Sequence, residues 1–106
     1  MKVSLKTAFS ILDGRLSTSI DDVYKMLNHI FDAEFMTHQL PTAMNRLKEI
    51  NPEWFKNSVS VINDIKNSNN TDDFKELMEL IDKGFPTYEI ELGKVESKID
   101  FLAGLV

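Results

Sequence analysis

Arg15 is the first residue in the chain whose type and setting could do chemistry. It follows an Asp13-Gly14 pair expected to form a turn. A guanidinium group can bind a carboxylate or phosphate through two parallel hydrogen bonds. The structural alternative, which we favour, is that Arg15 ties its own turn to a nearby helix, with Asp21 or Asp22 as the expected partner. Under the first interpretation, Arg15 is a candidate binding residue.

His38 and Gln39 form a second candidate binding site. They lie beside Thr37, which we expect to cap a helix. Free backbone N–H groups at a helix start, together with an imidazole and an amide, could hold an anionic or polar ligand. The alternative is that Thr37 caps the helix while His38 and Gln39 are solvated. A site that combined Arg15 with these two residues would make the protein a small-ligand binder or a minimal enzyme.

Other familiar catalytic and cofactor motifs are missing from the sequence. The chain has no cysteine, and its four glycines, at 14, 84, 93 and 104, are too far apart to form a phosphate-binding loop. Its two histidines, His29 and His38, lack the spacing of a zinc protease motif. Acidic residues adjoin at 21–22 and 72–73, where they would sit in first helical turns and offset the helix dipole. We therefore expect no cofactor, no metal and no enzymatic activity.

The hydrophobic periodicity predicts helices over most of the chain. We expect helices at 5–12, capped by Ser4 and ended by Gly14, at 20–32, capped by Ser19, and at 37–50. Asn51-Pro52 is expected to end the third helix, and Asn51 can equally cap a fourth helix, which ends before a polar loop at 67–71. Thr71 is expected to cap a fifth helix that ends at Gly84.

The C-terminal part of the sequence changes its period. Tyr88, Ile90 and Leu92 alternate with glutamates, which predicts a half-buried strand at 87–92 with those three residues facing inward. Its only candidate partner is the segment 2–4, and a short terminal helix is expected at 98–105. The predicted fold is a mainly α domain of five or six helices spanning 1–106, with one short strand pair near the termini.

The helices at 20–32 and 37–50 also resemble a helix-turn-helix pair. The exposed side of the second helix would display residues of the types that read base edges: His38, Gln39, Thr42, Asn45, Arg46 and Lys48. Only Arg46 and Lys48 carry a fixed positive charge there. DNA binding is therefore the alternative function.

The net charge of −5 is concentrated at one end of the chain. Residues 1–70 carry eight basic and eight acidic residues, whereas residues 71–106 carry four basic and nine acidic residues. An acidic surface repels phosphate backbones and suits a basic protein groove, although it can also serve only for solubility. Glu76, Glu79 and Glu89 are the candidate contact residues of such a surface.

Two motifs resemble those of small bacteriophage and prophage proteins of unknown function. They are Leu12-Asp13-Gly14-Arg15-Leu16 and Thr37-His38-Gln39-Leu40-Pro41-Thr42-Ala43. The resemblance covers roughly the first half of the chain and marks Asp13, Arg15, His38 and Gln39 as motif members. Related proteins often have an arginine where this chain has Thr42.

The resemblance implies a stoichiometric role and no particular chemistry. We expect a cytoplasmic accessory protein of phage type that binds a host protein, with anti-CRISPR-like inhibition of bacterial defence as one form of that role. No apolar run is long enough to span a membrane. We therefore expect a protein partner, no membrane association, and nucleic acid only under the alternative function.

Overall fold

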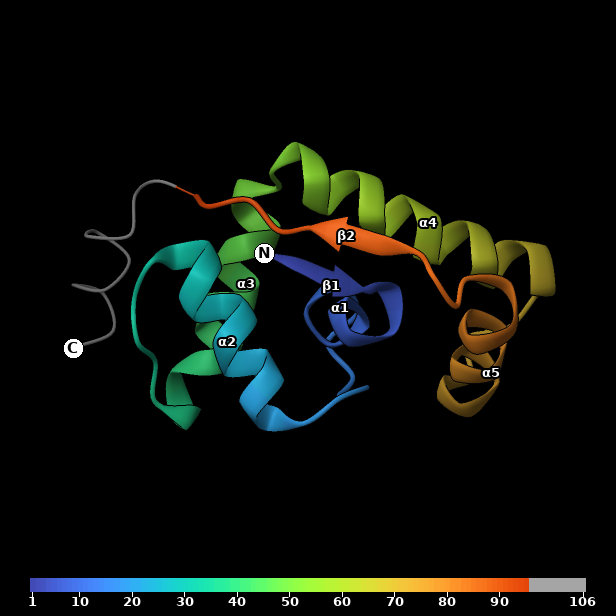
Figure 1. Cartoon of the computed structure of the whole chain (residues 1–106), viewed down its shortest axis with the longest axis horizontal. Helices are drawn as coiled ribbons and strands as arrows, with labels where there is room; N and C mark the ends of the chain where they lie inside the picture. The colour runs from blue at the N-terminus through green and yellow to red at the C-terminus, as the bar shows by residue number, and fades with distance from the viewer. Residues whose placement is uncertain (96–106) are drawn as a thin grey trace.

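The computed structural model describes residues 1–95 and confirms the predicted mainly α fold with a strand pair near the termini (Figure 1). The elements follow one another as β1 (Lys2–Ser4), α1 (Leu5–Leu12), α2 (Ile20–Phe31), the 3-10 helix η1 (Thr37–Gln39), α3 (Leu40–Ile50), α4 (Glu53–Asn69), α5 (Phe74–Gly84) and β2 (Glu89–Glu91). The terminal helix expected at 98–105 lies outside the described residues. Across residues 1–95, none of the helices has the length and apolarity needed to cross a bilayer.

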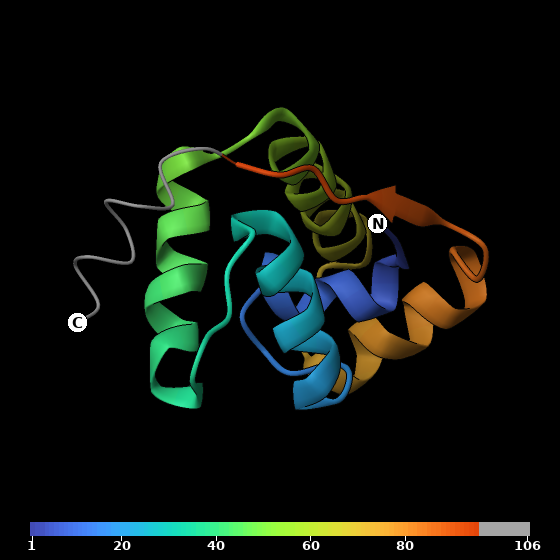
Figure 2. The ribbon, with the colours of Figure 1, turned by 60° about the vertical axis from the view of Figure 1, so that its left-hand side comes forward.

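Helix α1 lies at the centre of the fold. It packs against α2, α4, α5 and both strands, and Figure 2 shows it between α2 and α5. Leu5, Ala8 and Phe9 are fully buried, as their spacing predicts, and Ser10 and Ile11 on its other side are buried too. Lys6 and Thr7 remain partly exposed, so α1 buries more than one stripe without being fully enclosed.

The two strands join the start of the chain to its acidic end. They pair antiparallel, with Lys2 opposite Glu91, Val3 opposite Ile90 and Ser4 opposite Glu89, so the expected partner segment is confirmed. Ile90 and Leu92 are buried beneath the sheet. Beyond β2, the backbone N–H of Val95 donates to the carbonyl of Ile30 at 2.8 Å, which fastens the chain to the end of α2.

Tyr88 does not face inward as the strand pattern predicts. Its side chain is 39% exposed and packs edge-on against Phe85, with ring centroids 5.9 Å apart. The backbone N–H of Tyr88 donates to the carbonyl of Phe85 at 3.3 Å, so Tyr88 belongs to the turn after α5. Alternation of side chains applies only within a strand, and β2 begins one residue later.

The predicted caps at the first two helices are confirmed. The side chain of Ser4 accepts from the backbone N–H of Thr7, and that of Ser19 accepts from the N–H of Asp22. Gly14 has a φ of +99°, the left-handed conformation expected where α1 ends. These local signals set both ends of α1 and the start of α2, the two helices that flank the first motif.

Helix α4 is longer than the sequence predicts. Residues 67–69, expected to be part of a loop, continue the helix, which ends at Asn70 with a φ of 47°. The side-chain amide of Asn69 donates to the carbonyl of Ile65 at 2.8 Å, so the polar residues satisfy the last turn themselves. Asn51 ends α3 in a left-handed conformation rather than capping α4, and Pro52 takes the capping position.

Two threonines that were expected to cap helices have other roles. Asp73 caps α5 by accepting from the N–H of Glu76 at 3.0 Å, while the hydroxyl of Thr71 accepts from the N–H of Asp73 at 3.2 Å. Thr37 begins η1, and α3 starts only at Leu40. Both predictions were wrong by two or three residues because several polar residues adjoin at each site and any of them could cap.

Candidate functional site

Asp13 is the centre of a network of charged side chains. Its carboxylate accepts from Nε of Arg15 at 2.6 Å, from Nη2 of Arg15 at 3.2 Å and from Nζ of Lys66 at 2.8 Å. Only 9% of its side chain is exposed. The loop after α1 is thereby joined to Lys66 on α4, which lies 53 residues after Asp13 in the chain.

Asp72 completes this network at the start of α5. Arg15 donates from Nη1 to the backbone carbonyl of Asp72 at 2.7 Å and from Nη2 to its carboxylate at 2.9 Å. Lys66 lies 3.0 Å from the same carboxylate. The guanidinium carbon of Arg15 is also 5.7 Å from the ring centroid of Phe9 and 5.9 Å from that of Phe74.

Arg15 therefore ties its turn to the start of α5, in agreement with the structural role that we favoured from the sequence. The partner is Asp72 in place of the expected Asp21 or Asp22. Lys66 and Asp72 were missed as members of the network, because no local pattern links residues so far apart in the sequence. All three nitrogens of the Arg15 side chain donate within the protein.

The network shifts the acidity of its carboxyl groups. Burial raises the pKa of Asp13, but the hydrogen bonds from Arg15 and Lys66 lower it by more, so it lies below its usual range. The pKa of Asp72 is also lowered, mainly by its hydrogen bond with Lys66. Both groups are therefore charged at neutral pH, which suits an internal ionic clamp.

His38 and Gln39 are separate from Arg15. Among the described residues, no hydrogen bond or ion pair links Arg15 to either of them. The side-chain oxygen of Gln39 accepts from the backbone N–H of Met36 at 2.8 Å, while His38 is exposed. Thr37 hydrogen-bonds to the hydroxyl of Tyr24, which holds η1 against α2.

An apolar cavity of about 210 Å³ lies between the two motif segments. It is lined by Ser10, Gly14, Leu16, Ile20, Val23, Leu40, Pro41 and Met44. Leu16 and Ile20 are 55% and 42% exposed. The structure thus brings the two motifs together through apolar side chains, whereas Arg15, His38 and Gln39 do not line this cavity.

The predicted acidic contact residues differ from their acidic neighbours. Asp72 pairs with Arg15 and Lys66, Asp82 pairs with Lys6 at 3.1 Å, and Glu91 pairs with the amino group of Met1 at 2.6 Å. Glu76, Glu79 and Glu89 are exposed and form no ion pair within residues 1–95, as is also true of Asp73, which caps α5. Glu76 accepts a hydrogen bond from the hydroxyl of Thr71 at 3.0 Å. We call Glu76, Glu79 and Glu89 the α5–β2 carboxylates. Glu76 and Glu79 share one side of α5, while Glu89 lies on β2.

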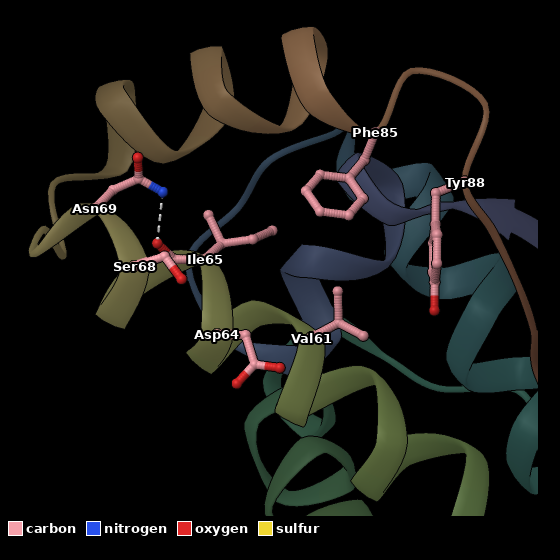
Figure 3. Close-up of a pocket in the computed structure, with 7 residues that line it drawn as sticks. All are labelled: Val61, Asp64, Ile65, Ser68, Asn69, Phe85 and Tyr88. Atoms are coloured by element: carbon pink, nitrogen blue, oxygen red, sulfur yellow. Dashed lines mark hydrogen bonds between the residues drawn. The ribbon is translucent and has the colours of Figure 1, made fainter.

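A second cavity, of about 340 Å³, opens between α4 and the turn that joins α5 to β2 (Figure 3). It is lined by Val61, Asp64, Ile65, Ser68, Asn69, Phe85 and Tyr88. The sequence did not predict this cavity, because the alternation at 88–92 places Tyr88 in the core. Its volume falls in the range of about 300–1,000 Å³ that ligand pockets occupy.

The predicted DNA-reading side of α3 carries an internal ion pair. Arg46 lies 3.1 Å from Glu49, one helical turn further along. Asn45 and Lys48 are exposed, as a recognition helix would require. The charge of Arg46 is thus partly offset by a carboxylate on the same helix. In the described part of the chain, no group of three or more potential ligands is arranged to hold a metal ion.

The comparisons with known proteins agree with the resemblance in that both point to a family of unknown function. A family model described as a domain of unknown function (DUF7736) matches residues 3–61, which is more than half of the chain. The matched segment contains both motifs and every residue that lines the smaller cavity. The chain belongs to this family. Curated proteins and solved structures gave no match.

Proposed function

We propose that this protein acts stoichiometrically, by binding another protein through the α5–β2 carboxylates. The observation that carries the proposal is the division of acidic residues in the C-terminal part of the described chain. Asp72, Asp82 and Glu91 form ion pairs within the protein, whereas Glu76, Glu79 and Glu89 are exposed and form no ion pair within residues 1–95. Complementary charge steers association and selects partners, so we expect the partner to present a basic surface.

The absence of convergent chemistry at the motif residues also favours binding. Arg15 and Asp13 use their charges on each other, on Lys66 and on Asp72, so they stabilise the scaffold. Gln39 bonds to its own backbone turn. Because its motif residues stabilise the fold, this protein suits a binding function carried by its surface.

In its fuller form, the proposal makes this chain a cytoplasmic accessory protein of phage type. Its target is then a host protein with a basic groove, such as a nuclease of bacterial immunity. The support is the resemblance of its two motifs to phage and prophage proteins, together with the acidic surface. That analogy concerns the class of protein and is independent of the contacts described above.

The test is affinity purification of the tagged full chain from lysogenic or infected cells at two salt concentrations. We expect one host protein to be recovered at about 0.1 M salt and much less of it at about 0.5 M, because salt screens exposed charges. Recovery of no specific protein, or of one whose yield does not depend on salt, would contradict a charge-guided interaction.

DNA binding by α2, η1 and α3 remains the second candidate. It is favoured by the exposure of Asn45 and Lys48 on α3, which follows α2 as a recognition helix would. A mobility-shift assay with genomic fragments at low salt tests it. Binding that falls with salt and is lost in Arg46→Ala and Asn45→Ala would support this candidate over protein binding. No shift at low salt would eliminate it.

A further inference from the structure

The larger cavity has two different kinds of wall. Val61 and Ile65 from α4 form one side, and the rings of Phe85 and Tyr88 project toward them from the other side (Figure 3). Asp64 lies at the edge on α4. An apolar channel with aromatic rings and a carboxylate at its rim can hold a flexible chain that ends in a cation.

The polar groups at the rim are mostly hydrogen-bond acceptors. Asp64 is exposed and has no cationic partner within residues 1–95. Asn69 uses its amide nitrogen to donate to the carbonyl of Ile65 at 2.8 Å, which leaves its amide oxygen to accept. Ser68 adds a hydroxyl that can also accept. Such a rim matches a ligand group that only donates.

Among protein side chains, arginine fits these features best. Its guanidinium has five donors and no acceptor, stacks on aromatic faces and is weakly hydrated, and its three-carbon stem is apolar. Lysine carries a more strongly hydrated point charge and stacks less well. We propose that this cavity receives an arginine side chain from the partner protein, with its stem against Val61 and Ile65 and its guanidinium between Asp64 and the two rings.

This inference rests on the proposed function and specifies its partner. The partner's basic surface would have an arginine that enters the cavity, while other basic residues face the α5–β2 carboxylates. The cavity lies outside the family-matched segment except for Val61. The anchor therefore belongs to the C-terminal part of this chain, and members of the family that differ there would select other partners.

The test is selection of random twelve-residue linear peptides on the full chain. We expect the enriched peptides to contain arginine. The best peptide should bind about tenfold more weakly to Asp64→Asn than to the original protein, a reduction typical of losing one charged hydrogen bond. Its Arg→Gln form should bind weakly to both proteins. Asp21→Asn makes the same charge change on α2 and should leave binding unchanged.

Three results would overturn the inference: no enrichment, enrichment of peptides without arginine, or equal binding to the original protein and Asp64→Asn. A second variant, Tyr88→Phe, retains the ring and should bind the peptide within about twofold. Arginine peptides that depend on the α5–β2 carboxylates but not on Asp64 would overturn the cavity assignment and leave the proposed function standing. Arginine peptides that bind the cavity, together with no protein partner recovered from cells, would support the cavity assignment and contradict the proposed function.

Discussion

Lys66 donates to Asp13 at 2.8 Å and so joins the family-matched segment to the part of the chain that follows it. Asp13 lies within residues 3–61, at the end of α1, whereas Lys66 lies beyond them on α4. Arg15 and Asp72 form a parallel connection at 2.9 Å. The motif loop is therefore held both to α4 and to the start of α5.

The Asp13 carboxylate should contribute measurably to stability. Asp13→Asn removes the acceptor charge that Arg15 and Lys66 share, and we expect the free energy of unfolding to fall by about 1–3 kcal/mol. Urea denaturation followed by circular dichroism measures this change. Asp21→Asn, an exposed neighbour without an ion pair in the described chain, should change stability by less than about 0.5 kcal/mol. Equal effects of the two substitutions would contradict the clamp.

Stability should also fall in acid because of the same network. The pKa values of Asp13 and Asp72 are lower in the folded protein than in the unfolded chain. Such groups contribute their stabilisation fully above the unfolded pKa of about 3.9, and it is lost as the pH falls through the folded pKa. Urea titrations between pH 6 and pH 2 should show a smaller loss for Asp13→Asn than for the original protein. Parallel pH profiles would show that Asp13 is not responsible.

Gly93 should not tolerate a side chain. A Cβ atom at this position would lie 3.0 Å from two atoms of the Trp54 ring, so the indole would have to move. We expect Gly93→Ala to lower the free energy of unfolding by about 1–3 kcal/mol, as overpacking does. Thermal denaturation with tryptophan fluorescence as the probe measures it.

Gly84 is the matched control for that substitution. A Cβ atom there would meet nothing within 4 Å, and Gly84 ends α5 with no positive φ. Gly84→Ala should leave stability unchanged or raise it by up to about 1 kcal/mol. The close contact at Trp54 would be refuted if the two substitutions had the same effect.

Ser10 should be essential to the loop that carries Arg15. It is buried within α1, and its hydroxyl oxygen accepts from the backbone N–H of Ser17 at 2.8 Å. Ser10→Ala leaves that N–H without an acceptor, and we expect a loss of about 1–3 kcal/mol in unfolding free energy. Ser60→Ala, at an exposed position of α4, provides the control in the same urea titration. A neutral Ser10→Ala would mean that solvent replaces the lost hydrogen bond.

Much of the fold could be predicted because its signals are local. The caps at Ser4 and Ser19 and the turn at Gly14 depend on neighbouring residues. The alternation at Ile90 and Leu92 predicts a strand, and the segment 2–4 was its only candidate partner in the sequence. Errors arose where local signals were ambiguous. At 67–71 the polar composition favoured a loop, but hydrogen bonds such as that of Asn69 with Ile65 continue the helix.

The candidate site was less predictable because it depends on contacts between distant residues. The tie formed by Arg15 could be anticipated, but its partner Asp72 lies 57 residues away. The cavity beside Tyr88 depends on one residue falling in a turn rather than in a strand. The three carboxylates chosen from the charge distribution are exposed and form no ion pair within residues 1–95, and their role as contact residues stays a prediction.

Matched charge reversals distinguish binding of a basic partner by the α5–β2 carboxylates from a general effect of net charge. One variant combines Glu76→Lys, Glu79→Lys and Glu89→Lys. The control combines Asp21→Lys, Glu34→Lys and Glu53→Lys, three exposed residues of the family-matched segment. Both variants change the net charge equally, and circular dichroism checks that both fold.

The measurement is the amount of the same host protein recovered with each tagged chain. We predict that recovery falls at least tenfold for the first variant, because like charges then face each other across the interface. The control variant should recover nearly as much as the original protein. Equal recovery by both variants, or a loss confined to the control, would mean that the α5–β2 carboxylates are not the binding surface.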